Sequence, residues 1–270
     1  MMPFAEVHRL HSRAMDRSLN DPDLVEWISA RSDPFGARHG LARSGCAGLF
    51  LGCVFGVHLT LLVQLAVGAL PMRMCLLRWC CYVVALSGFH AAEFLTTARY
   101  KWKDVSYDSW LLNHSAAYGY AAAAAMVEFW LEAYFSPGLK SSKPLLALGL
   151  AVVLLGHGAR VAAMVTCGEH FAHRIMIAKD PRHRLVTHGI YAHLRHPSYT
   201  GWFWWSVGTQ VVLANPLCFV AYAVASWRFF ADRVPFEEAT LRAFYPAEYP
   251  AYVRRTRVLI PFLRSDDHED

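Results

Sequence analysis

The sequence predicts an all-α polytopic membrane protein of about six transmembrane helices, the last two forming a short helical hairpin. Three observations favour this class. Of 270 residues, 55% are hydrophobic and only 17% are charged, whereas an average soluble domain has roughly 25% charged residues. The aromatic content of 14% excludes a disordered chain as a general description. The apolar residues are also gathered into stretches long enough to cross a hydrocarbon core, which takes about 20 residues of helix.

Four apolar stretches have the length of a full span. They are residues 45–70, 75–97, 110–135 and 145–167. The first contains no Asp, Glu, Lys or Arg, whereas the others contain Arg78, Glu93, Glu128, Glu132 and Arg160. Ionisable side chains are costly in lipid, so six of them are expected to face the interior of the bundle: Glu93, Glu128, Glu132, His90, His157 and Arg160. Interfacial positions explain the four charged ones at least as well, because these lie within about a turn or two of their helix ends.

Two shorter stretches, 198–214 and 216–232, meet at the turn signal Asn215-Pro216. Each has about 17 residues, or roughly 25 Å of helix, which is the short end of spanning length. They either cross the membrane fully or form a re-entrant hairpin. In both cases their outer ends emerge on the same side.

Basic residues give the chain a net charge of +5 and are unevenly placed. Most lie in 1–44, 98–109, 168–197 and 233–270, so the positive-inside rule predicts cytoplasmic termini and two cytoplasmic basic loops. We therefore expect a polar cytoplasmic segment (1–44), a four-helix transmembrane region (45–167) and a C-terminal region (168–270). The C-terminal region contains two polar pieces that the hairpin brings together, and there we expect a functional site.

The polar piece before the hairpin has features of a cofactor loop. Gly189 suits a tight turn, and Pro197 suits the first turn of the next helix. The free N–H groups at that helix start could bind an anion or a polar cofactor group. Tyr191, Tyr199 and Trp202 offer flat faces for a purine ring.

Histidines in the same loop raise the alternative of a metal site. His170 and His173 are three residues apart, as are His193 and His196. No Asp, Glu or Cys joins either pair at ligand-like spacing, so we expect interface histidines and no metal.

Arg233 and Glu237, after the hairpin, are four residues apart and share a helix face if the helix continues. Taken alone, this pattern also fits a surface ion pair. It equally fits an interfacial anchor, as for Arg228. Pro235 between them can restart or kink the helix.

Residues 156–262 resemble the C-terminal catalytic half of the isoprenylcysteine carboxyl methyltransferase family. The matching stretches are LVTHGIYAHLRHPSYTGWFWWSVGTQVVLANP (185–216), WRFFADR (227–233) and EEATLRAFYPAEYPAY (237–252). Upstream, the order and spacing of the family are kept by FHAAEFL (89–95), DSWLLNHS (108–115) and AAMVTCGEHFAH (162–173). The R-H-P-x-Y motif alone is less specific, because it recurs in phospholipid methyltransferases and sterol reductases.

The resemblance implies an enzyme of the endoplasmic-reticulum membrane, an S-adenosylmethionine-dependent protein-S-isoprenylcysteine carboxyl O-methyltransferase with a cofactor pocket on its cytoplasmic face. It would methylate the C-terminal α-carboxylate of prenylated cysteine in CaaX-processed proteins such as small GTPases. Its partners would be these proteins and the lipid bilayer, with no nucleic acid. Two alternatives stay open: a lipid-directed enzyme with the same C-terminal unit (a phospholipid N-methyltransferase or a nicotinamide-dependent sterol reductase), and a non-enzymatic membrane transporter.

The resemblance also implies roles for individual residues. The S-adenosylmethionine-binding residues it implies are Met176, His183, Arg184, Leu185, Val186, Tyr191, His196, Pro197, Ser198, Tyr199 and Glu237. Arg233 and Glu237 are the implied catalytic residues, with Arg233 on the substrate side. Met176 departs from the family, which has Gln at this position.

Overall fold

The computed structural model describes residues 40–71, 73–179 and 184–263. Within these ranges the regular structure is helical, apart from one isolated bridge between Leu194 and Arg257. The α-helices are α3 (Leu41–Ala66), α4 (Met74–Tyr100), α5 (Ala116–Phe135), α6 (Lys143–Cys167), α7 (Pro197–Leu213), α8 (Pro216–Phe244) and α9 (Tyr249–Arg255). The 3-10 helices are η1 (Trp102–Asp104), η2 (Tyr107–Trp110), η3 (Pro137–Lys140), η4 (Gly168–His170) and η5 (Gly189–Ala192).

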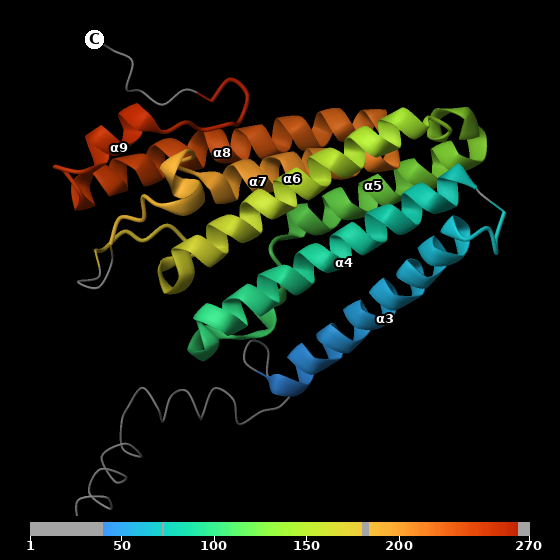
Figure 1. Ribbon diagram of the computed structural model, residues 1–270, viewed down its shortest axis with the longest axis horizontal. Helices are drawn as coiled ribbons and strands as arrows, with labels where there is room; N and C mark the ends of the chain where they lie inside the picture. The colour runs from blue at the N-terminus through green and yellow to red at the C-terminus, as the bar shows by residue number, and fades with distance from the viewer. Residues whose placement is uncertain (1–39, 72, 180–183, 264–270) are drawn as a thin grey trace, which may run out of the picture.

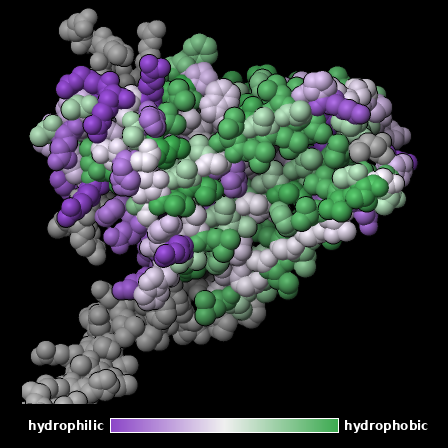
Figure 2. All heavy atoms as spheres, viewed as in Figure 1, coloured by the Kyte–Doolittle hydropathy of each residue, from purple (hydrophilic) through white to green (hydrophobic). Residues whose placement is uncertain are grey.

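The six long helices form an elongated bundle, with α3 at one edge against α4 (Figure 1). The turn between α7 and α8 lies at one end, and α9, η5 and the loop after α6 lie at the other. Hydrophobic side chains cover much of the middle of the visible face, whereas hydrophilic ones gather at the end that carries α9 (Figure 2). By length and composition, α3, α4 and the segment Lys143–His170 can each cross a membrane. The all-helical class is therefore confirmed for the residues that the structure describes.

Most predicted stretches correspond closely to helices, but two differ. The stretch 110–135 becomes helical only at Ala116, because Leu111 is in the left-handed region (φ 54°) and Ser115 caps the helix by accepting a bond from the Tyr118 N–H. The helix predicted for 216–232 runs on to Phe244. Pro235 lies exposed inside α8 and does not restart it, so Arg233 and Glu237 belong to one helix.

Glycines bring α6 and α7 into unusually close contact. A Cβ on Gly156 would lie 2.5 Å from the Trp205 nitrogen, and one on Gly201 would lie 2.6 Å from the Arg160 nitrogen. Gly149 and Gly208 make similar close approaches further along the same pair of helices. Because only hydrogen fits at these positions, the two backbones touch, and Arg160 of α6 is held beside the start of α7.

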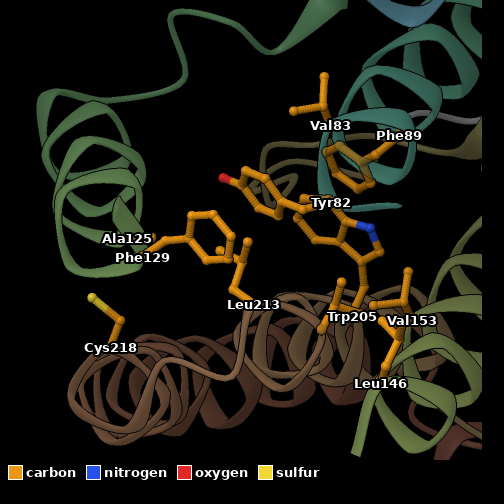
Figure 3. Packing of buried hydrophobic residues seen from close by; sticks show 11 residues of the cluster. Tyr82, Val83, Phe89, Ala125, Phe129, Leu146, Val153, Trp205, Leu213 and Cys218 are labelled. Carbon is orange, nitrogen blue, oxygen red and sulfur yellow. The ribbon is translucent and has the colours of Figure 1, made fainter. Parts of the chain in front are cut away.

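Aromatic side chains fill the centre of the bundle. Phe89 of α4 stacks on Trp205 of α7 with ring centroids 3.9 Å apart, and Tyr82, Phe129 and Leu213 converge on the same cluster (Figure 3). This cluster joins α4, α5 and α7 between the two polar ends.

Most charged side chains in the apolar stretches are buried inside the bundle, which is the first of the two positions expected for them. At the end with the α7–α8 turn, Arg78 is fully buried and donates to the carbonyls of Lys140 (2.8 Å) and Val212 (2.6 Å). Lys140 is also fully buried and pairs with Glu132 (2.6 Å). Glu128 accepts bonds from two backbone N–H groups in the first turn of α8, both at 2.7 Å. The buried charges at this end therefore satisfy backbone groups and one another.

Candidate functional site

A cavity of about 160 Å³ opens at the end of the bundle that carries α9. Its walls come from the loop after α6, the start of α7, the last turns of α8, and α9. It contains every predicted cofactor residue that the structure describes, namely Met176, Arg184, Leu185, Val186, Tyr191, His196, Pro197, Ser198, Tyr199 and Glu237. His183 lies outside the described residues.

Local sequence explains how the loop reaches this cavity. Gly189 adopts a positive φ of 56° and starts η5, as the turn prediction required. Pro197 occupies the first turn of α7, where its missing N–H leaves no bond unmade. Trp202, predicted to offer a face to a purine, instead packs against Phe230, with ring centroids 5.7 Å apart. Trp202 does not line the cavity, so the structure does not bear out that part of the prediction.

The paired histidines also separate. His170 belongs to the lining of the cavity, whereas the His173 ring donates to Glu93 of α4 at 2.9 Å. His193 is exposed and His196 is 4% exposed. The two histidines of each pair therefore lie in different surroundings.

A buried ion-pair cluster lies next to the cavity, and the sequence alone did not reveal it. Glu238 is 1% exposed and accepts from Arg195 (2.5 Å) and His196 (3.1 Å). Arg195 also donates to the Thr256 carbonyl at 2.9 Å, which joins the segment just before α7 to the chain after α9. The position of His196 at the opening of the hairpin predicts a ring outside the core, and this prediction is wrong because the ring donates to Glu238 inside the protein. The only hint in the sequence was the adjacent Glu237-Glu238 pair, of which Glu237 alone was assigned a role.

Glu238 lies beyond the apolar part of α8, and its ionisation contributes to folding. Burial alone raises the pKa of Glu238, but hydrogen bonds and charge from His196 and Arg195 outweigh burial and hold that pKa below its usual range. A carboxyl whose pKa is lower in the folded state stabilises that state above its unfolded pKa. The stabilisation is lost as the pH falls through the lower, folded value.

We predict that Glu238→Gln destabilises the protein by about 3–5 kcal/mol at neutral pH, because it leaves Arg195 buried without its counter-ion. The difference from wild type should begin to shrink as the pH falls below the unfolded pKa of about 4.3, and it should be smallest below the lower, folded pKa, where the wild-type carboxyl is protonated in both states. Thermal unfolding in detergent across this pH range measures both effects. The exposed Glu248→Gln is the control, and equal losses in the two variants would refute the role of the cluster.

Tyr199 connects the two residues that we expected to act together. Its hydroxyl donates to the Glu237 carboxylate and accepts from the Arg233 Nε at 2.8 Å. The Arg233 Nη2 donates to the His173 carbonyl. Arg233 and Glu237 are thus linked through a phenol from α7, not by direct pairing along α8.

Arg233 faces a second cavity of about 640 Å³, which lies between α4, η2, the loop after α6 and α8. Phe171, Ala172 and Arg174 line both cavities, so this short segment forms the wall between them. Within the part of the chain that the structure describes, Arg233 forms no ion pair with a carboxylate. Its Nε and Nη2 donate instead to two uncharged oxygens, the Tyr199 hydroxyl and the His173 carbonyl.

Comparison with known proteins shows the family to which the chain belongs. The sequence profile of the isoprenylcysteine carboxyl methyltransferase family matches residues 147–243. The protein-S-isoprenylcysteine O-methyltransferase of Xenopus laevis is 43% identical over 215 residues, covering 80% of this chain and 72% of that protein. The chain belongs to the isoprenylcysteine carboxyl methyltransferase family.

Other relatives agree with membership of this methyltransferase family. The Tribolium castaneum protein-S-isoprenylcysteine O-methyltransferase is 46% identical over 182 residues, or 67% of this chain. The chain spans 65% of that relative's length, slightly under two thirds. A solved structure of a eukaryotic intramembrane Ras methyltransferase of the isoprenylcysteine carboxyl type has a TM-score of 0.73 and 42% identity. That match covers 79% of this chain and 74% of the other. The chain therefore has the membrane fold of this methyltransferase family.

Proposed function

We propose that the protein moves a methyl group from S-adenosylmethionine to the free α-carboxylate of a C-terminal prenylated cysteine. The observation that carries this proposal is the meeting of two cavities at Arg233, Tyr199 and Glu237. One cavity suits a polar nucleoside cofactor and the other suits an acidic acceptor. The substrates would be CaaX-processed proteins, small GTPases among them.

The side chains of the first cavity fit the chemical groups of S-adenosylmethionine. Glu237 supplies a carboxylate for an ammonium group, and Arg174 and Arg184 supply guanidinium groups for a carboxylate. Tyr191 and Tyr245 add aromatic faces for an adenine ring. The chemistry supplied by this cofactor is a methyl group on a sulfonium, a strong methyl donor.

The second cavity has to hold the acceptor and needs no base. An α-carboxyl has a pKa of about 3.5, so it is already ionised at neutral pH. Arg233 would hold it through a planar fork, and Tyr199 and the His173 carbonyl fix the direction of that fork. Orientation is the main contribution asked of the protein, and well-oriented reactants can reach a large effective molarity, about 10⁵ M or more.

The same proposal gives the protein an orientation in the endoplasmic-reticulum membrane. We propose six spans, formed by α3 to α8, with both termini in the cytoplasm. The basic loops then lie on the cytoplasmic side with the cofactor cavity. A prenyl chain is soluble in lipid and can enter from the bilayer between helices, whereas a charged cofactor must come from the cytosol.

Binding of S-adenosylmethionine to the purified protein in detergent tests the cofactor assignment. We expect saturable binding in a calorimeter and none of a reduced nicotinamide cofactor. Nicotinamide binding without S-adenosylmethionine binding would favour the sterol reductase alternative. Binding of neither would favour the transporter.

We predict that His196→Ala weakens S-adenosylmethionine binding by about tenfold or more, because the ring lines the cofactor cavity and stacks on Tyr199 with an interplanar angle of 3°. It should also lower stability, since Glu238 loses a buried donor. Calorimetric affinity and thermal unfolding separate the two effects. The exposed His193→Ala is the matched control, and unchanged affinity with lost activity would move His196 to the acceptor side.

A further inference from the structure

Glu93 is a buried carboxylate in α4 that lines neither cavity, yet its contacts reach both of them. It is 2% exposed and accepts both prongs of the Arg160 guanidinium from α6, one from Nε and one from Nη2, the latter at 3.0 Å. Arg160 is itself only 6% exposed. The pair lies where the glycines of α6 and α7 bring the two helices together.

One branch of contacts leads to the first cavity. The Arg160 Nη1 donates to the Ser198 hydroxyl at 3.0 Å, and Ser198 lines the first cavity in the opening turn of α7. The Arg160 guanidinium therefore binds Glu93 through Nε and Nη2, and through Nη1 it binds a residue that lines the first cavity.

The other branch leads to the second cavity. The His173 ring donates from Nε2 to the same Glu93 oxygen that accepts from Arg160 Nη2, at 2.9 Å. The main-chain carbonyl of His173 accepts from Arg233. Both His173 and Arg233 line the second cavity, so Glu93 fixes the residue that in turn fixes Arg233.

Stability alone does not explain a charge pair at this depth. Replacing a buried ion pair by apolar residues of similar size is often neutral or stabilising, because desolvation offsets the attraction. What a bidentate pair adds is geometry, since both oxygens and the guanidinium plane are fixed. Here the partners of Glu93 lead to different cavities: Arg160 contacts Ser198 of the first, and His173 lines the second.

We propose that Glu93 is a positioning residue that sets the alignment of the acceptor carboxylate with the methyl donor, through Arg160 and Ser198 on one side and His173 and Arg233 on the other. The inference rests on the proposed function. A misplacement of about 1 Å between reactants can lower a rate by roughly 100-fold without removing any binding contact. The effect of Glu93 should therefore fall on kcat and spare KM.

The test compares Glu93→Gln with Glu132→Gln in the full-length protein, using S-adenosylmethionine and a prenylcysteine acceptor. Glu132 is the matched control, because it pairs with buried Lys140 at the opposite end of the bundle. We expect Glu93→Gln to lower kcat by about 10- to 100-fold while the KM of each substrate changes by less than about threefold. Glu132→Gln should leave kcat unchanged for the folded protein.

His173→Ala supplies an independent measurement, because its side chain is 36% exposed and its removal leaves the buried Glu93–Arg160 pair in place. We expect kcat to fall by about tenfold with unchanged thermal unfolding, and the double variant Glu93→Gln/His173→Ala to be no slower than Glu93→Gln alone. If Glu93→Gln fails to fold, His173→Ala decides the question. Wild-type kcat in both variants, or equal losses in Glu93→Gln and Glu132→Gln, would overturn the inference. An inactive wild type would instead contradict the proposed function.

Discussion

Replacing Arg233 by Lys is expected to lower methyl transfer by about 10- to 150-fold, the loss of a charge-assisted hydrogen bond worth roughly 1.5–3 kcal/mol. The guanidinium is held at two points, by Tyr199 from α7 and by the His173 carbonyl from the loop. An ammonium keeps the charge but cannot make both contacts and still offer two parallel donors to a carboxylate. Binding of S-adenosylmethionine should survive, because Arg233 lines the other cavity.

Arg228→Lys is the control for this prediction, since Arg228 is an exposed arginine on the same helix. Its rate should match wild type at saturating S-adenosylmethionine. If Arg233→Lys also matches wild type, Arg233 is an interfacial anchor and the acceptor carboxylate is held elsewhere.

Gly201→Ala is expected to destabilise the fold strongly. Its added Cβ would lie 2.6 Å from both the Arg160 nitrogen and the Gly156 oxygen, and backbone atoms at the centre of two packed helices cannot move aside locally. Overpacking of a core by a single methyl typically costs about 1–3 kcal/mol and sometimes more. We expect a value at or above the top of that range. The separation of α6 and α7 should also pull Arg160 away from Ser198 and reduce activity in whatever protein still folds.

Gly158→Ala on the exposed side of α6 provides the comparison, because its Cβ meets nothing within 4 Å. It should be neutral or stabilising by up to about 1 kcal/mol through helix propensity. Thermal unfolding in detergent measures both variants. A Gly201→Ala protein as stable as Gly158→Ala would show that the two helices are not in backbone contact.

The sequence was a good guide to local structure. Long apolar stretches locate α3, α4 and α6 to within a few residues, because the cost of exposing backbone in lipid leaves few alternatives to a helix. The cofactor-loop residues also meet in one cavity, since most of them follow one another along 184–199 and chain connectivity keeps them close.

The sequence was a poor guide to long-range pairing. Glu93 and Arg160 are 67 residues apart, and Arg195 and Glu238 are 43 apart, so their pairing depends on how the helices pack. The sequence also could not predict whether α8 continues through Pro235. A proline removes one backbone hydrogen bond, and whether the helix then ends depends on how well the neighbouring turns are held in place. Arg233 and Glu237 do belong to one helix, but their spacing gave no sign that a tyrosine from α7 links them.

The central claim is that the two cavities bring a methyl donor to a prenylcysteine carboxylate. The most direct test incubates the purified protein with S-adenosylmethionine labelled in its methyl group and an S-farnesylated cysteine peptide, alongside the same peptide as its C-terminal amide. We predict label in the free acid only, in a form that mild base releases as methanol, since a carboxyl methyl ester is base-labile. Label in the amide, or base-stable label in added phospholipid with none in the peptide, would contradict the account.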